Sequence, residues 1–278
     1  MDARQVVRRR AVAEEAARAA GAVHLRYRDV ALVREVKGED RTNYSTRVDV
    51  EAHEAARAVI LRAFPGEPVV GEEDEDAYQE ASRLVDSGCW LVDPLDGTSE
   101  YVHGSPVFSA IVSFVAGREP LAAAVYFPVL DELFSAGAGQ GASLNGVPIR
   151  VSSETDLGRA LLTTAYRTPS PERARQFADG LARLLPHIEA FRLPGAPAVS
   201  ACYVACGRFD VFARIGLPPA PSGARQGQPW ETAAFVLLVR EAGGAVAASD
   251  GGPADVLGIN LYAASEALIR QVFAVLSE

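Results

Sequence analysis

Cysteine and lysine are scarce in this chain of 278 residues, which has three cysteines and a single lysine, Lys37. Such an odd, sparse cysteine set is not typical of a disulfide framework, so a reducing cytoplasm is the expected environment. Cys202 and Cys206 are spaced as on one helix face, but no second Cys or His pair lies nearby in the sequence. Two small core residues therefore explain them better than a zinc site.

Basic residues are fewer than acidic ones, 27 against 36, which gives a formal net charge of -9 at pH 7. Nucleic-acid polymers are bound mainly by clustered Lys and Arg, so such a partner is not expected. No secretory signal pattern is apparent, and no uncharged apolar run reaches the roughly 18 residues of a membrane span. We expect a cytoplasmic protein with no membrane partner.

The composition is that of a globular protein, since 49% of the residues are hydrophobic. Hydrophobic periodicity predicts an α/β (α+β) fold, with a first part over 1–153 and a second over 154–278. Helices are expected at 3–22, 49–63, 171–186, 197–207, 230–242 and 265–277. Strands are expected at 31–33, 68–70, 89–92, 107–116, 120–127, 132–136, 149–152, 160–164, 189–192, 209–213 and 244–247, with a hairpin turn at Asn145-Gly146.

The segment Asp93-Pro94-Leu95-Asp96 places two carboxylates around a rigid proline, directly after a predicted buried strand. Hard cations prefer oxygen ligands, and both carboxylates and the Leu95 carbonyl supply them. Gly97-Thr98 follows, and a helix that begins at Thr98 would point its first N–H groups at an anion. The ordinary alternative is an Asp-Pro turn followed by an Asp-Gly helix cap.

Three further acids lie at the ends of predicted elements: Asp49, Glu72 and Glu231. Each has an ordinary explanation as a cap, a loop acid or a first-turn residue favoured by the helix dipole. Their joint placement at element ends favours a shared site.

The chain resembles the inositol monophosphatase family, within the metal-dependent, lithium-sensitive phosphatase superfamily. The stretches that carry the resemblance occur in family order: Thr46-Arg47-Val48-Asp49, Gly71-Glu72-Glu73, Asp93 to Thr98, and Trp230-Glu231-Thr232-Ala233-Ala234. The resemblance implies a layered αβαβα sandwich like that of inositol monophosphatase and fructose-1,6-bisphosphatase, and a homodimer. It also implies two or three Mg²⁺ ions and a small phosphorylated alcohol as substrate, either inositol monophosphate, a sugar phosphate or histidinol phosphate.

The same resemblance implies roles for single residues. The metal ligands would be Glu72, Asp93, the Leu95 carbonyl, Asp96 and Glu231. The catalytic residues would be Glu72, Thr98 and Asp49, with the Thr98 hydroxyl orienting the attacking water. The substrate would be bound by Asp96, Gly97, Thr98, Gly195, Ala196 and Arg214.

Three positions depart from the family pattern. Glu231 stands where an aspartate is usual, Glu100 where an asparagine is, and Arg214 where an acid usually binds substrate hydroxyls. A guanidinium grips anions, so a second reading is a 3′(2′),5′-bisphosphate nucleotidase acting on 3′-phosphoadenosine 5′-phosphate. The ordinary alternative for Arg214 is a solvated surface residue. A catalytically weakened phosphoester-binding protein is a third reading of the chain. The Pro-rich insertion at 218–229 is typical of neither the inositol and sugar phosphatases nor the nucleotidase. It either shapes the substrate pocket or is an ordinary loop.

Overall fold

A computed structural model describes residues 1–30, 34–36, 44–166, 170–215, 228–248, 250–258 and 261–277. The predicted strand at 31–33, Lys37 and most of the insertion at 218–229 lie outside these ranges.

Helices and strands alternate irregularly along the chain. The helices are α1 (Ala3–Tyr27), α2 (Arg47–Ala63), α3 (Ala77–Leu84), α4 (Thr98–Val102), α5 (Pro171–Leu184), α6 (Pro197–Ala205), α7 (Pro229–Glu241) and α8 (Glu266–Ser277), with 3₁₀ turns at Leu157–Arg159 and Leu185–His187. The strands are β1 (Glu35–Val36), β2 (Tyr44–Ser45), β3 (Val69–Gly71), β4 (Cys89–Asp96), β5 (Ser109–Ala116), β6 (Glu119–Phe127), β7 (Glu132–Gly137), β8 (Ala142–Leu144), β9 (Val147–Pro148), β10 (Leu161–Thr163), β11 (Ala190–Arg192), β12 (Val211–Ala213), β13 (Ala245–Ala247) and β14 (Tyr262–Ala264).

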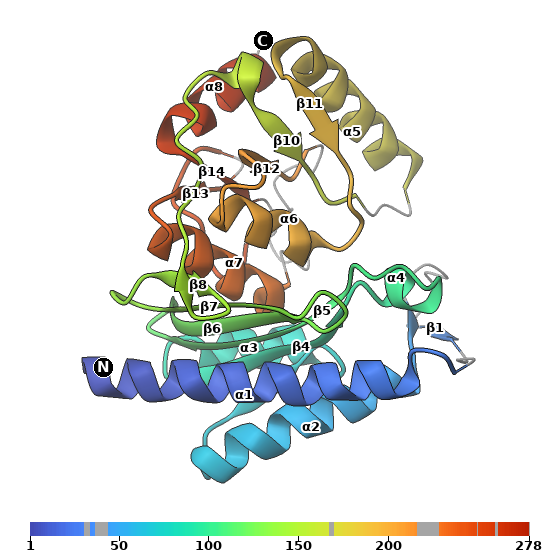
Figure 1. The fold of residues 1–278 in the computed structure, drawn as a ribbon, viewed down its shortest axis with the longest axis vertical. Coiled ribbons are helices and arrows are strands. Elements are labelled where there is room, and N and C mark those ends of the chain that lie inside the picture. The colour runs from blue at the N-terminus through green and yellow to red at the C-terminus, as the bar shows by residue number, and fades with distance from the viewer. Residues whose placement is uncertain are drawn as a thin grey trace.

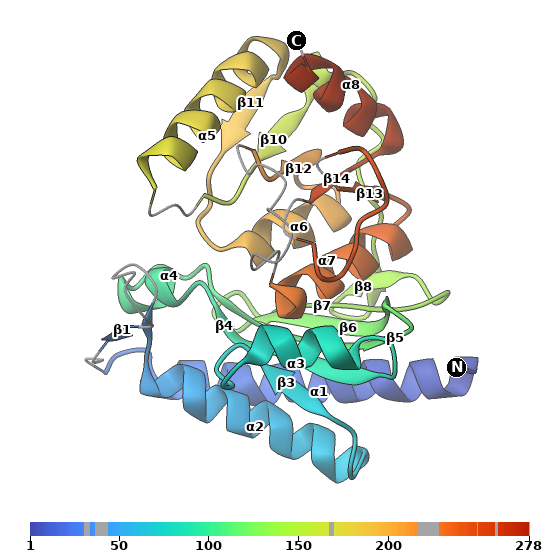
Figure 2. The ribbon, with the colours of Figure 1, turned by 180° about the vertical axis from the view of Figure 1, so that it is seen from behind.

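Five layers stack in the order helix, sheet, helix, sheet, helix (Figures 1 and 2). Helices α1 and α2 cover one face of a seven-stranded sheet in the order β3-β4-β5-β6-β7-β8-β9. Helices α6 and α7 lie between that sheet and a five-stranded one, β11-β10-β12-β14-β13, whose outer face packs on α5 and α8. The expected αβαβα sandwich is confirmed. The predicted boundary near residue 153 falls between the two sheets, but α7 packs on both and joins them through a common core.

The strands of the large sheet send alternate side chains to opposite helix layers. In β4, Trp90 and Val92 pack with α1 and α2, whereas Cys89 and Leu91 pack with Trp230 of α7. This is the period of two that a pleated strand imposes, applied to a strand that is buried on both faces. By the same rule Asp93, which has the parity of Leu91, faces α7.

Helix α1 approaches the sheet closely because its inner face is built from small residues. Ala13, Ala17 and Ala20 are fully buried, and His24 continues the same row at the helix end. Residues at spacings of three and four share one helix face, so the alanines bring the backbone close and the imidazole fills the remaining space.

Some elements differ from the predictions. Residues 77–84 form α3, which was not predicted, because Ala77 and Ala81 are buried among apolar neighbours while Glu80 stays exposed. The strand predicted at 149–152 is wrong, since β9 ends at Pro148 and the Val151 N–H donates to the Ala242 carbonyl at the end of α7. β14 was not predicted, because its pairing with β12 and β13 selects it. The hairpin turn at Asn145-Gly146 is confirmed, joining β8 and β9.

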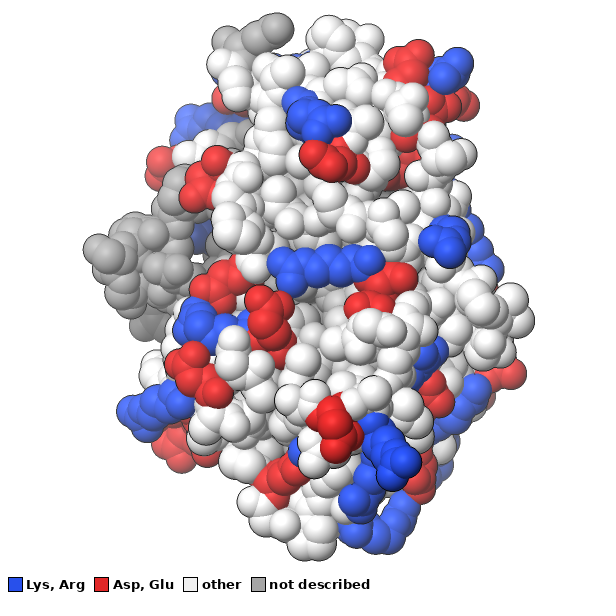
Figure 3. All heavy atoms as spheres, turned by 90° about the vertical axis from the view of Figure 1, so that its left-hand side faces the viewer, with Lys and Arg blue, Asp and Glu red and all other residues white. Residues whose placement is uncertain are grey.

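Charges of both signs are interspersed on the face of the molecule that Figure 3 draws. Among the described residues, no helix combines the length and the apolar character needed to cross a bilayer.

Candidate metal and phosphate site

Asp93 and Asp96 reach the same side of the large sheet because β4 loses its regular register between them. Asp93 has the parity of Leu91, so it faces α7, whereas Asp96 would face the opposite side in a regular strand. The pairing of β4 with β5 shifts between these two residues, from Asp93 opposite Ile111 to Asp96 opposite Ser109. Such an irregularity re-aims a side chain, and here it brings the second carboxylate toward the first.

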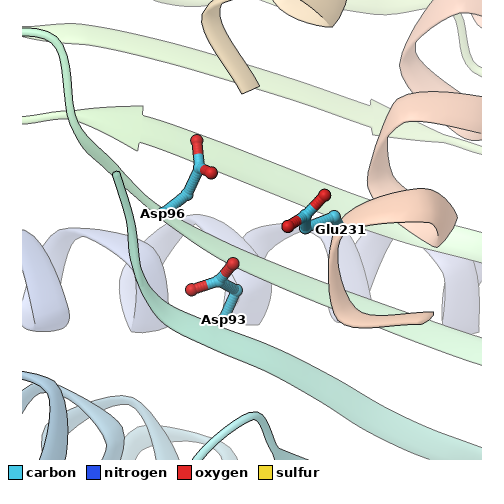
Figure 4. Close-up of side chains that lie close together, drawn as sticks. All are labelled: Asp93, Asp96 and Glu231. Atoms are coloured by element: carbon cyan, nitrogen blue, oxygen red, sulfur yellow. The ribbon is translucent and has the colours of Figure 1, made fainter. Parts of the chain in front are cut away.

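Glu231 meets the two aspartates from the first turn of α7. Among the described residues, Asp93, Asp96 and Glu231 form a group whose ligand oxygens all lie within 4.8 Å of one another. Figure 4 shows the three carboxylates pointing toward one another, the aspartates from the end of β4 and the glutamate from α7. Residues 135 or more positions apart in the sequence thus share one small volume.

The three carboxylates are almost fully buried, with exposures of 1% for Asp93, 4% for Asp96 and 5% for Glu231. Burial raises the pKa of the Asp96 carboxyl well above its usual range, and the charge of Glu231 raises it further. The N–H of Ala198 opposes this shift by donating to Asp96 Oδ2 at 3.0 Å. Clustered buried carboxylates are costly unless a cation offsets them, and an all-oxygen set suits a hard divalent ion.

The backbone between the aspartates is fixed from both sides. The Leu95 N–H donates to Asp93 Oδ1 at 3.1 Å. On the opposite side His24 Nε2 lies 2.7 Å from the Pro94 carbonyl oxygen, and the imidazole packs edge-on against Phe108. Complete burial lowers the pKa of His24 to about 4, so the ring is neutral at pH 7 and donates from Nε2.

Thr98 connects the turn after Asp96 to α2. Its hydroxyl lies 3.1 Å from Asp49 Oδ1 and 3.2 Å from the Leu95 carbonyl oxygen. The other Asp49 oxygen accepts from both the N–H and the hydroxyl of Thr46, each at 2.8 Å, in a capping box at the start of α2. Asp49 is therefore both a helix cap and a partner of Thr98, so the two explanations of this residue are compatible.

Glu72 lies at the edge of the three-carboxylate group. It follows β3, and its N–H donates to the Val92 carbonyl at 3.0 Å, which extends the parallel pairing of β3 with β4 beside Asp93. Its charge contributes to the raised pKa of Asp96. Glu72 is outside the group that meets within 4.8 Å, but within electrostatic reach of it.

Gly97, Gly195 and Ala196 meet beside the aspartates. Gly97 has a φ of 88°, and a Cβ there would lie 2.9 Å from the Ala196 Cβ. Gly195 has a φ of 106°, and a Cβ there would lie 2.3 Å from Glu100 Oε1. Both glycines therefore allow a backbone approach that a side chain would prevent. Glu100 consequently lies beside the glycines, and its charge also raises the pKa of Asp96.

Arg214 is bound to one of the clustered carboxylates. It is 8% exposed, so the reading as a solvated surface residue is wrong. Its Nη2 donates to Glu231 Oε2 at 2.5 Å. The departures at 214 and 231 from the family pattern are thus one structural feature, a buried ion pair.

Three supports of the site were not predicted from the sequence. His24 holds the Pro94 carbonyl, while the Ser109 hydroxyl and the Ala198 N–H both donate to Asp96 Oδ2, at 3.4 and 3.0 Å. The row of buried alanines that ends at His24 was the available signal for the first. The other two depend on pairing between distant elements and left no pattern in the sequence.

Comparisons with known proteins identify the family and the fold of the chain. Residues 6–277 match the model of the inositol monophosphatase family. Inositol monophosphatase 2 of Solanum lycopersicum is 37% identical over 77% of each chain. Nus factor SuhB of Xylella fastidiosa is 35% identical over 84% of this chain and 78% of its own. The crystal structure of the suppressor protein SuhB from Bartonella henselae superposes with a TM-score of 0.83 at 28% identity, covering 96% of this chain and 98% of that one.

Proposed function

The chain belongs to the inositol monophosphatase family of phosphoric monoester hydrolases, and we propose that it hydrolyses a small phosphorylated alcohol with bound Mg²⁺. The observation that carries the proposal is the convergence of Asp93, Asp96 and Glu231 within 4.8 Å, next to the Gly97-Thr98 turn. Two or three ions would be held by the oxygens of Asp93, Asp96, Glu231, the Leu95 carbonyl and the nearby Glu72. Bound Mg²⁺ would offset the charge of the phosphate dianion and lower the pKa of water.

The remaining chemistry falls to the chain's own side chains. Asp49 accepts from Thr46 through one oxygen and faces the Thr98 hydroxyl with the other. If Thr98 donates its proton to Asp49, its oxygen lone pairs are left to accept from a water molecule. Thr98 and Asp49 would thus orient the attacking water, which is a positioning contribution to the rate.

The phosphate would lie against the turn at Gly97 and Thr98. The close approach of Ala196 and Gly195 to this turn supports a substrate pocket that is bounded by two backbone segments. Glu100 at its rim would accept hydrogen bonds from substrate hydroxyls or face a cationic group such as a protonated imidazole. Inositol monophosphate, a sugar phosphate and histidinol phosphate all meet this description.

The nucleotidase reading depends on Arg214 as the grip for a second phosphate. In the structure that guanidinium is held by Glu231, which supports a role at the metal ligands more than one at a second anion. Turnover of inositol 1-phosphate against 3′-phosphoadenosine 5′-phosphate would separate the two substrates. A preference for the bisphosphate would favour the nucleotidase.

The test of the proposed function is a phosphate-release assay over these phosphoesters, with Mg²⁺ and with chelator, and with and without Li⁺. We expect Mg²⁺-dependent release, inhibited by Li⁺, that Asp93→Asn abolishes while the variant remains folded by circular dichroism. The matched control is Asp86→Asn, an exposed aspartate shortly before β4, which should keep wild-type release.

Two results would contradict the proposal. Release that persists in Asp93→Asn would exclude the metal assignment. No release from any ester with the wild-type chain, despite Mg²⁺ binding, would favour the weakened phosphoester-binding protein. The homodimer stays a prediction, which light scattering of the purified chain would check.

A further inference from the structure

The buried pair of Arg214 and Glu231 brings a fixed positive charge into the group of metal ligands. Glu231 contributes one of three carboxylates that meet within 4.8 Å, and the same carboxylate accepts from Arg214 Nη2 at 2.5 Å. Both side chains are nearly inaccessible to solvent, at 9% and 6% exposure, so water screens this charge little. A charge so close to a cation site must affect what binds there.

The backbone of Arg214 is held in place by the smaller sheet. The residue directly follows β12, and its N–H donates to the Leu261 carbonyl at 3.2 Å, which continues the pairing of β12 with β14. Glu231 is fixed likewise, because its N–H donates to the Gln228 carbonyl in the first turn of α7. The guanidinium and the carboxylate are therefore positioned by two different elements and meet as a consequence of the fold.

A guanidinium and a divalent ion are alternative counter-charges for one carboxylate. Arg214 holds Oε2 of Glu231, which leaves one oxygen of that carboxylate for any other cation. Glutamate is one methylene longer than aspartate, which lets the carboxylate lie between the arginine and the two aspartates. The arginine charge repels a divalent ion at this position in addition to occupying an oxygen.

We propose that Arg214 is a positioning residue that neutralises Glu231 when no metal is bound and lowers the affinity of the ion that Glu231 would ligate. The inference rests on the proposed metal site. Arg214 would thus set the Mg²⁺ affinity of the position beside Glu231. The affinity of the position beside Asp93 would be less affected, because the guanidinium contacts Glu231.

The test is a calorimetric titration of the chelator-treated full chain with Mg²⁺ alone. Arg214→Met keeps most of the side-chain volume without the charge, and should bind its weaker Mg²⁺ roughly tenfold or more tightly than the wild type. Arg214→Lys keeps the charge and should bind as the wild type does. Arg9→Met is the matched control, because Arg9 is also 8% exposed and pairs at 2.5 Å with Glu67, outside the site.

Thermal unfolding gives a second readout that needs no activity. In chelator, Arg214→Met should unfold at a lower temperature than the wild type, because the buried Glu231 carboxylate loses its counter-charge. Added Mg²⁺ should raise its midpoint by more than it raises that of the wild type. Arg9→Met should lower the midpoint equally with and without Mg²⁺.

If Arg214→Met does not fold, the double variant Arg214→Met/Glu231→Gln removes both charges and tests the same idea. It should be more stable in chelator than either single variant. Unchanged or weaker Mg²⁺ binding by Arg214→Met would overturn the inference, and so would a double variant that is less stable than both single variants. If the wild-type chain still binds Mg²⁺ in these cases, the proposed function is unaffected. A wild-type chain that binds no Mg²⁺ would overturn both.

Discussion

The buried imidazole of His24 makes the metal-free chain sensitive to mild acid. Complete burial lowers its pKa from the ordinary value of 6.5 to about 4, while the bond to the Pro94 carbonyl opposes this shift only in part. Between these values the unfolded chain binds a proton that the folded chain does not. Stability due to His24 is therefore complete above pH 6.5 and is lost as the pH falls toward 4.

The size of the effect follows from the two pKa values. Linkage gives a loss in unfolding free energy of about 1 kcal/mol at pH 6, about 2 kcal/mol at pH 5 and about 3 kcal/mol at pH 4. His24 is fully buried, so screening by solvent reduces this little. A loss of this size is a large share of the stability of a typical domain.

The perturbation that isolates this contribution is His24→Gln. Glutamine does not titrate between pH 4 and 7, and its amide N–H can donate to the Pro94 carbonyl. The variant should be less stable than the wild type at pH 7, because it loses the contacts of the ring with Tyr101 and Phe108. The gap should narrow by about 3 kcal/mol as the pH falls to 4.

The assay is urea unfolding in chelator at each of these pH values. The carboxylates titrate in both proteins, so only the difference between the two curves reports on His24. Parallel curves from pH 7 to pH 4 would refute the reasoning, because they would mean that the ring is protonated in the fold or exposed to water. Weaker Mg²⁺ binding by His24→Gln at pH 7 would connect the imidazole to the geometry of Asp93 and Asp96.

Two further predictions concern the turn after β4 and its neighbours. Thr98→Ala should lower kcat about a hundredfold with little change in KM, because the hydroxyl beside Asp49 positions the water. Steady-state kinetics would check this, with Thr98→Ser as the control that keeps the hydroxyl. Equal loss in both variants would contradict it. Gly195→Ala should cost about 1–3 kcal/mol of unfolding free energy in urea, more than Gly66→Ala, which has a φ of 84° but nothing within 4 Å of the added Cβ. Equal losses would mean that the contact with Glu100 adds nothing.

Much of the fold could be predicted from local patterns. The helical period of α1, the apolar and β-branched runs of β5 and β6, and the Asn145-Gly146 turn could all be recognised, because each is a local signal. The short helix α3 and the three-residue β14 were missed, because their packing and pairing with other segments select them.

Some residues of the site could be predicted from the sequence. Asp93, Asp96 and Glu231 stand out because each ends or begins an element beside a rigid or small neighbour. Their meeting depends on the register shift in β4 and on the packing of α7 against the large sheet. Neither has a signal in the sequence, because both arise from contacts between distant segments.

The sequence by itself determined the kind of chemistry, since carboxylates, a proline-fixed carbonyl and a glycine turn suit hard cations and phosphate whatever their surroundings. Only the tertiary structure decided what the unusual residues do. Arg214 looked like a substrate grip or a surface residue, and folding places its guanidinium on Glu231. His24 had no predicted role, and folding places its imidazole against the Pro94 carbonyl. The physical reason is burial, which pairs charges and shifts pKa values only once distant elements have excluded water between them.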